Sequence, residues 1–249
     1  YLNDGVDCSV VNCSFVDCFS FYSGFAVSVD GDNTDCSVVG CSFVNCSSDS
    51  GGAIYLDGGS ENGVVANCSF VDCTAPSNYL LQCGGSGIVE GCSFVNCSAY
   101  SVIMRISGTI ANCSFVNCSS PGFGGSIMGS SIAIANCSFM NCSSAREGGA
   151  IYLDGDDASV TNCSFVNCFS TNDDDGGGAI YWYGGSGTVA DCSFVNCSST
   201  GNNCGGGAIC WEGSSGTVAD CSFVNCSSTG NDSGGGAIYW YGNYGTVAD

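Results

Sequence analysis

Positive charge is almost absent from this chain, and its absence narrows the chemistry open to it. The 249 residues contain no His and no Lys, and the only cations are Arg105 and Arg146. Against 23 Asp and Glu residues, the formal net charge is −21 at pH 7. The chain therefore lacks the commonest general base, the imidazole ligand of zinc sites and the lysine of phosphate-binding loops. It also offers no surface for nucleic acid or for insertion into an anionic membrane.

Helix formers and long apolar runs are also scarce. The sequence has four Glu, one Gln and two Arg, and no window shows helical periodicity. It has no run of 18 apolar residues, so no helix is predicted to span a membrane. Yet 45% of the residues are hydrophobic and 11% aromatic, which is typical of a folded chain. We therefore expect a fold built from short strands.

A hexapeptide, Cys-Ser-Phe-Val-Asn-Cys, recurs nine times with little change. Successive copies lie 21 to 29 residues apart. The first cysteines of the copies are Cys13, Cys41, Cys68, Cys92, Cys113, Cys137, Cys163, Cys192 and Cys221. The second cysteines are Cys18, Cys46, Cys73, Cys97, Cys118, Cys142, Cys168, Cys197 and Cys226. A fixed repeat of this length indicates a solenoid.

Two further motifs complete the repeat. Gly-Gly-Ala-Ile begins at Gly51, Gly148, Gly177, Gly206 and Gly235, and Gly-Thr-Val-Ala-Asp precedes some hexapeptides. Each repeat then contains three short extended pieces separated by turn formers. We predict an all-β fold, a right-handed parallel β-helix with three strands per coil and about nine coils, as one domain over residues 1–249. Both ends fall in mid-repeat, so the chain is expected to be an excerpt of a longer array.

Equal positions in successive coils lie about 4.8 Å apart and should form columns. Small cysteines fill two columns, and the corner residues before the hexapeptide should form an amide ladder at Asn12, Asn67, Asn112, Asn136, Asn162, Asp191 and Asp220. A buried aromatic column is predicted from Phe15, Phe43, Phe70, Phe94, Phe115, Phe139, Phe165, Phe194 and Phe223. Nine coils give a rod of roughly 40 Å.

The Gly-Gly-Ala-Ile and Phe-Val-Asn-Cys repeats resemble those of polymorphic outer-membrane proteins and of adhesin-like parallel β-helix proteins. The resemblance covers almost the whole chain and implies a right-handed β-helix on a cell surface. It departs from the family at the third residue after Phe15 and its equivalents, which is Cys where the family has Asn. An asparagine ladder of the family is then a cysteine ladder here.

The redox state of the 23 cysteines remains open from the sequence alone. Five extended residues separate the two cysteines of a hexapeptide by about 16 Å, too far for a disulfide. Cysteines of adjacent coils are close enough for one, and the alternative is a column of buried free thiols. Cys204 and Cys210, which occur in one repeat only, are the best candidates for a local bridge. Such a cysteine content favours an extracellular or cell-surface setting.

Catalysis and metal binding find weak support. Some parallel β-helices cleave polysaccharides, and two carboxylates suffice to hydrolyse a neutral glycan. The candidate pairs, Asp156 with Asp157 and those in 173–175, lie in Gly-rich turns where Asp is a common turn residue. We predict no enzyme, no catalytic residue and no cofactor, with calcium at 30–33 or 154–157 retained as a candidate.

Two surface features are candidates for recognition. The aromatic residues after Gly-Gly-Ala-Ile would form a stripe, in which Trp182 and Trp240 are the candidate glycan contacts. Among twelve Asn-x-Ser sequons, Asn231 in a loop is the candidate glycosylation site if the corner asparagines face inward.

The sequence thus predicts an extracellular structural or adhesive rod or filament component. Its expected partners are copies of itself, end to end or laterally, and host or cell-surface proteins or glycans. The alternatives are a glycan-binding module and, less favoured, a polysaccharide-degrading enzyme.

Overall fold

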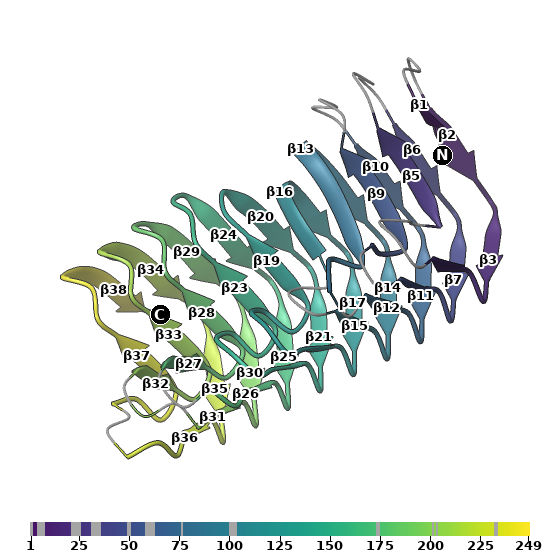
Figure 1. Ribbon diagram of the computed structural model, residues 1–249. Helices are drawn as coiled ribbons and strands as arrows, with labels where there is room; N and C mark the ends of the chain where they lie inside the picture. The colour runs from purple at the N-terminus through teal and green to yellow at the C-terminus, as the bar shows by residue number, and fades with distance from the viewer. Residues whose placement is uncertain are drawn as a thin grey trace.

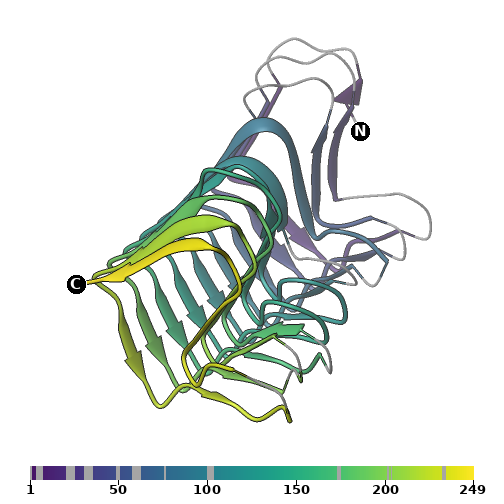
Figure 2. The ribbon, with the colours of Figure 1, turned by 90° about the vertical axis from the view of Figure 1, so that its left-hand side faces the viewer.

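The computed structural model describes residues 2–3, 8–20, 26–30, 36–48, 51–57, 63–75, 77–99, 104–172, 175–200, 202, 204–231 and 234–249. These residues form a right-handed parallel β-helix without any helix, which confirms the predicted fold. Figure 1 shows the coils stacked from the N-terminal to the C-terminal end, and Figure 2 shows them from the C-terminal end, with the last coil in front of the others. Every strand pairs in parallel with the equivalent strand of the next coil, as a solenoid requires.

The hexapeptide forms the most regular sheet, because its Ser-Phe-Val core has the same register in all nine coils. Phe points inward, while Ser and Val point outward, as the period of two demands. Eight turns therefore separate the first and last of these strands. The sheet contains β3 (Ser14–Val16), β7 (Ser42–Val44), β11 (Ser69–Val71), β14 (Ser93–Val95), β17 (Ser114–Val116), β21 (Ser138–Met140), β25 (Ser164–Val166), β30 (Ser193–Val195) and β35 (Ser222–Val224).

A second nine-stranded sheet follows the second cysteine, in a segment that the sequence analysis assigned to a turn. Each strand has only two residues, so its pairing comes from the coils above and below and not from local propensity. The strands are β4 (Phe19–Ser20), β8 (Ser47–Ser48), β12 (Thr74–Ala75), β15 (Ser98–Ala99), β18 (Ser119–Ser120), β22 (Ser143–Ser144), β26 (Phe169–Ser170), β31 (Ser198–Ser199) and β36 (Ser227–Ser228).

The remaining two strand positions of each coil belong to one 18-stranded sheet. The position before the hexapeptide contains β2 (Ser9–Val11), β6 (Ser37–Val39), β10 (Val64–Ala66), β20 (Ile132–Ala135), β24 (Ala158–Thr161), β29 (Gly187–Ala190), β34 (Ser215–Ala219) and β38 (Tyr244–Ala248). The position before that contains β1 (Leu2–Asn3), β5 (Val27–Asp30), β9 (Ile54–Asp57), β19 (Ile127–Gly129), β23 (Ile151–Leu153), β28 (Ile180–Trp182), β33 (Ile209–Trp211) and β37 (Ile238–Trp240).

Two coils merge both positions into one long strand. These strands are β13 (Leu81–Glu90) and β16 (Met104–Ala111), which pair with each other through most of their length. β16 leads into the hexapeptide that follows the shortest repeat step, so no residues are left for a turn between its two halves. A two-stranded sheet of β27 (Asp175–Gly177) and β32 (Cys204–Gly206) lies beside the main coil.

The corners at both ends of the hexapeptide strand are left-handed turns. Asn136 and Asn141, which flank β21, have φ angles of 55°, and the Asn and Asp residues at the equivalent corners have φ angles of 50 to 55°. Asn and Asp tolerate this region better than other residues with a side chain. Of the amide ladder predicted at the first corner, the described contacts include one step, in which Asn162 donates to Asn136 at 2.6 Å. Asn112 donates instead to Glu90 at 3.3 Å.

The longer amide ladder runs along the second corner, which the sequence analysis missed. There Asn117 donates to Asn96, Asn141 to Asn117, and Asn167 to Asn141, at 3.0 to 3.1 Å. The fifth residue of every hexapeptide is Asn or Asp, which is the signal that could have revealed it.

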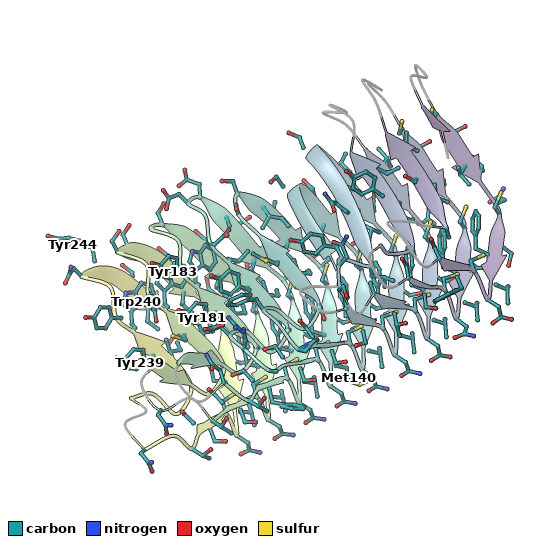
Figure 3. All side chains as sticks on the ribbon, viewed as in Figure 1. Met140, Tyr181, Tyr183, Tyr239, Trp240 and Tyr244 are labelled. Carbon is teal, nitrogen blue, oxygen red and sulfur yellow. The ribbon has the colours of Figure 1, made fainter. Side chains whose placement is uncertain are left out.

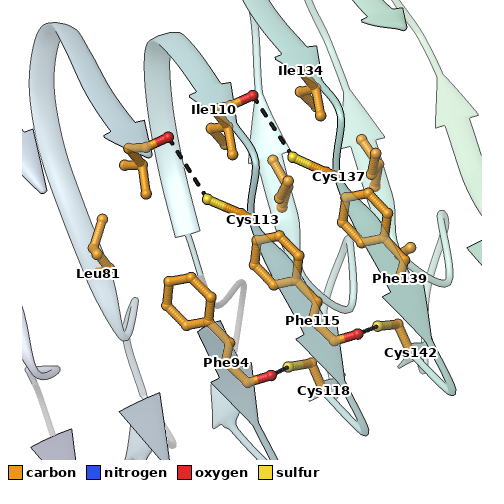
Figure 4. Close-up of a cluster of buried hydrophobic side chains, with 14 of the residues drawn as sticks. Leu81, Phe94, Ile110, Cys113, Phe115, Cys118, Ile134, Cys137, Phe139 and Cys142 are labelled. Carbon is orange, nitrogen blue, oxygen red and sulfur yellow. Dashed lines mark hydrogen bonds between the residues drawn. The ribbon is translucent and has the colours of Figure 1, made fainter. Parts of the chain in front are cut away.

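The interior is built around the phenylalanine column, as predicted. Successive rings lie 4.6 to 4.9 Å apart with interplanar angles of 2 to 4°. Phe94, Phe115 and Phe139 are fully buried between the two cysteine columns (Figure 4). Face-to-face stacking is not the preferred geometry of an isolated aromatic pair. The in-register backbone imposes it, and eight such steps make the column about 38 Å long.

Three coils near the C-terminus contain a second aromatic column. Trp182, Trp211 and Trp240 stack at 4.2 and 4.7 Å. Each indole lies over a glycine five residues later in the same coil, and a Cβ atom at Gly187 or Gly216 would overlap the indole ring. The coil before them has Leu153 with Ala158 at these positions. In each of these coils a large inward side chain is followed five residues later by a small one, and the two together fill the space inside the coil.

Candidate functional site

The two cysteine columns are the densest array of reactive side chains in the described structure. From Cys41 onward, each column thiol donates to the carbonyl two residues earlier and to a carbonyl of the coil below. Cys118 thus contacts the oxygen of Phe94 at 3.6 Å, and Cys142 contacts that of Phe115 at 3.6 Å (Figure 4). The pattern repeats in every coil from Cys46 to Cys226. All thiols of a column therefore share one orientation.

Among the described residues, the first column has backbone N–H donors to sulfur in addition to the thiol contacts. The backbone N–H of Cys137 donates to the sulfur of Cys163 at 3.4 Å, and the N–H of Cys163 donates to Cys192 in the same way. Cys13 and Cys68 repeat the arrangement with Cys41 and Cys92. Backbone donors to sulfur stabilise the thiolate form.

Both columns consist of free thiols in this structure, which is one of the two states that the sequence left open. Hydrogen bonds to neighbouring thiols and burial raise the pKa values of Cys113 and Cys163, whereas hydrogen bonds from the thiols on either side lower the pKa values of Cys92 and Cys137. The direction of the shift thus alternates along the first column. Outside the columns, desolvation raises the pKa of the Cys83 thiol to about 12. Thiols with a raised pKa stay neutral and act as small apolar side chains.

Cys210 differs from the column cysteines, because it is disulfide-bonded. This supports the predicted local bridge, although the side chain of Cys204 lies outside the described residues. Cys210 takes the place of a tyrosine in an outward-facing column, between Tyr181 and Tyr239. Tyr181 is only 4% exposed, and its ring stacks on that of Tyr152 at 5.4 Å. The pKa of Tyr152 is raised to about 12 by burial and by nearby carboxylates.

The predicted glycan contact at Trp182 is wrong. Its indole is fully buried, because the alternation along β28 turns Trp182 inward and Tyr183 outward. Trp240 belongs to the same inward column and packs against the core from the last coil. The exposed aromatic residues near the C-terminus are Tyr183, Tyr241 and Tyr244, with exposed fractions of 61%, 74% and 80%. Figure 3 labels Tyr183 and Tyr244. The indole nitrogens of the three tryptophans have no hydrogen-bond partner.

The acidic turn at 154–157 is a ladder of hydrogen bonds to neighbouring coils. Asp156 accepts from the backbone N–H of Gly185 at 2.6 Å, and Asp157 accepts from Ser186 at 3.0 Å. Asp154 accepts from Ser130 at 2.5 Å. Within the described ranges, no group of three or more His, Cys, Asp or Glu side chains is arranged to hold a metal ion. The other candidates, at 31–33 and 173–174, lie outside those ranges.

The corner asparagines face solvent, contrary to the condition on which the sequon argument rested. Asn12, Asn45, Asn96 and Asn141 are all exposed, because a left-handed corner points its side chain away from the core. Asn231 is exposed as well, and its backbone N–H donates to Asn202 at 2.9 Å. Exposure therefore does not single out Asn231 from the corner sequons.

The outer surface of the hexapeptide sheet is flat and free of charge. We call it the Ser-Val face, and it consists of the outward Ser and Val side chains of the nine hexapeptide strands, with Met140 replacing one Val. Met140, Val16 and Val224 are 43%, 55% and 48% exposed. The carboxylates nearest in sequence are those of the corner residues Asp17, Asp72, Asp191 and Asp220 at its rim.

The outward side chains of the β-helix repeat from coil to coil, and buried side chains fill its interior. A hollow is found at the end of the last coil, where Val218, Phe223 and Ile238 line it. Among the residues described, no helix is long and apolar enough to cross a membrane.

The family comparison agrees with this geometry. The family described as "Right handed beta helix region" matches residues 25–194, which is more than half of the chain. Comparisons with curated proteins and with solved structures return no match. The matched segment covers the hexapeptide sheet from β7 to β30. The chain belongs to the right-handed β-helix family.

Proposed function

We propose that the chain is a stiff segment of an extracellular structural or adhesive rod, and that it associates sideways with other copies of itself. The resemblance to adhesin-like repeat proteins supports a cell-surface role. The observation that carries the proposal is the Ser-Val face, an uncharged and periodic surface on a chain of net charge −21. Labelling of intact source cells with an antibody against the chain tests its location.

A second copy is the occupant that fits this face best. Both copies present the same side-chain columns at spacings of 4.6 to 4.9 Å, so Val side chains of one copy fit between those of the other. A strongly acidic or basic partner would gain no electrostatic attraction from an uncharged surface. Copies that meet there keep the carboxylates of Asp17, Asp72, Asp191 and Asp220 at the rim, where salt screens them.

The size of the face makes the association weak for a single pair. A column about 38 Å long and strands of three residues, about 10 Å long, give roughly 400 Å² per copy. Two copies then bury about 800 Å², which is below the usual size of a specific interface. Longer arrays would add area in proportion to their coils, and many weak contacts along a rod give strong overall binding.

Sedimentation velocity over a range of protein and salt concentrations tests the proposal. Association should increase with protein concentration and with added salt, because salt screens the repulsion between the two acidic chains. The double variant Val95→Asp/Val166→Asp places two charges on the face and should remain monomeric. Ala145→Asp/Thr200→Asp adds the same charge at exposed positions away from the face and should associate like the parent chain.

Equal behaviour of the two double variants would contradict the role of the face. A parent chain that stays monomeric at every salt concentration would contradict lateral association itself.

Glycan binding is the second candidate, now carried by different residues. Tyr183 and Tyr241 occupy the same position two coils apart, with Glu212 between them. The two stacking steps of the neighbouring tryptophans place these positions about 9 Å apart. Exposed aromatic rings at such a spacing suit successive sugar rings. Loss of glycan-array binding in Tyr183→Ala, with binding retained in Trp182→Phe, would support this function.

A further inference from the structure

The first cysteine column has a constant spacing between sulfur atoms. Every thiol of the column points the same way, because each donates to the equivalent carbonyls of its own coil and of the coil below. The spacing of the sulfurs then equals the rise between coils. The phenylalanine rings two residues later measure that rise as 4.6 to 4.9 Å.

That spacing matches a metal ion held between two thiolates. A metal–thiolate bond of about 2.3 Å, taken twice in a straight line, spans about 4.6 Å. Zinc does not fit, because it requires four ligands and the described residues form no group of three or more. Soft ions that accept two ligands in a line do fit, and thiolates select Cu(I) among the biological metals.

We propose that adjacent thiols of the first column, such as Cys137 and Cys163, bind a two-coordinate thiophilic ion of the Cu(I) class between successive coils. The inference rests on the stacking of the coils and is independent of the proposed lateral association. The backbone N–H of Cys137, which already donates to the sulfur of Cys163, would stabilise the bound thiolate.

The binding step exchanges protons for metal. One Cu⁺ displaces the protons of two thiols, which leave to solvent, and no electron is transferred. The resulting site carries one negative charge, which the N–H donors of the column partly offset. Hg²⁺ releases the same two protons and gives a neutral site, so it should bind at least as well in a buried position.

The number of ions depends on which cysteine of the column is removed. Nine thiols taken in adjacent pairs hold four ions and leave one thiol over. Cys113→Ser removes the fifth member and leaves two runs of four, which still hold four ions. Cys137→Ser removes the sixth member and leaves runs of five and three, which hold three ions. The second column contributes equally to both variants.

Native mass spectrometry of the full reduced chain, titrated anaerobically with Cu(I) alone and with Hg(II) alone, tests the proposal. We expect Cys137→Ser to hold one ion fewer than the parent chain and Cys113→Ser to hold the same number. Cys83→Ser removes a buried thiol outside the column and should leave the number unchanged. Zn(II) should not bind, and proton release should be two per ion.

Equal losses in Cys113→Ser and Cys137→Ser would overturn the proposal, because binding would not follow adjacent pairs. Failure of the parent chain to bind Cu(I) or Hg(II), or equal binding of Zn(II), would overturn it too. Circular dichroism checks that each variant folds, and Cys113→Ala with Cys137→Ala repeats the comparison if a serine variant does not.

Discussion

Two regions of this β-helix stack the same coils differently. The hexapeptide side is the nine-stranded sheet of the hexapeptide strands, and the aromatic side is the 18-stranded sheet that carries the tryptophan column. On the hexapeptide side each position repeats one residue, so that Phe115 lies between Phe94 and Phe139 in identical register. On the aromatic side a single column passes from Gly129 through Leu153 to Trp182.

The difference shows that a coil can be filled in two ways. The hexapeptide side keeps the residue of each column constant, so neighbouring coils match by identity. The aromatic side keeps the volume within each coil roughly constant, since the inward residue after the turn is large where its partner is small. Ile132 follows Gly129, Ala158 follows Leu153 and Gly187 follows Trp182.

Alkaline pH should produce the largest effect, and it acts mainly on the hexapeptide side. Burial and hydrogen bonds between thiols raise the pKa values of Cys83, Cys113 and Cys118 in the folded state, whereas the unfolded chain ionises these thiols near their ordinary pKa of 9.0. The stability that these thiols contribute is therefore complete below pH 9 and falls as pH rises toward their folded pKa values. Ionisation of Cys83 alone, with a folded pKa of about 12, should lower the free energy of unfolding by about 3 kcal/mol at pH 11.

Urea unfolding at pH 7, 9 and 11 measures this dependence. Cys118→Ala and Cys83→Ala should each flatten the profile. An unchanged free energy of unfolding between pH 7 and 11 would show that burial does not keep the thiols neutral.

Truncation of the phenylalanine column should be the most damaging single substitution. Phe115→Ala removes a fully buried ring with stacked neighbours on both sides, and we expect a loss of about 3 to 5 kcal/mol in the free energy of unfolding. Phe223→Ala, in the last coil and only partly buried, should cost clearly less. Equal losses, measured by denaturant unfolding, would mean that stacking within the column adds little.

On the aromatic side a small residue should be as sensitive as a large one. Gly187→Ala forces a Cβ atom into the indole of Trp182 and should cost about 1 to 3 kcal/mol. Adding Trp182→Leu recreates the pair found at Leu153 and Ala158, so the double variant should be more stable than the sum of its single changes predicts. The pair Gly187→Ala with Trp240→Leu, two coils apart, should be additive.

The corners that join the two sides should show the smallest effect. Asn136→Ala keeps a side chain in the left-handed region without the amide, and should cost about 1 to 2 kcal/mol. Asn136→Gly should cost less, because Gly40 and Gly91 occupy the same corner in other coils with φ angles of 65° and 61°. Thermal unfolding of the two variants compares them, and equal melting temperatures would assign the cost to the lost amide ladder.

Most of the fold was predictable because identical residues must stack on one another in a solenoid. The repeat located the Phe column, both cysteine columns and the first corner. The two-residue strands such as β22 were missed, since two residues carry no periodicity and pair only through their neighbours. The candidate site was less predictable. Alternation sent Trp182 and Tyr181 to opposite faces, but the sequence could not tell which face was the interior.

By itself, the sequence determined the repeat, the parallel stacking, the excess of negative charge and the lack of His and Lys chemistry. Only the tertiary structure decided which aromatic residues reach solvent, how the thiols are oriented and where charge is missing from the surface. The reason is physical. Repetition along a chain dictates what lies above and below each residue, whereas the direction of a side chain depends on how the rest of its coil closes around the core.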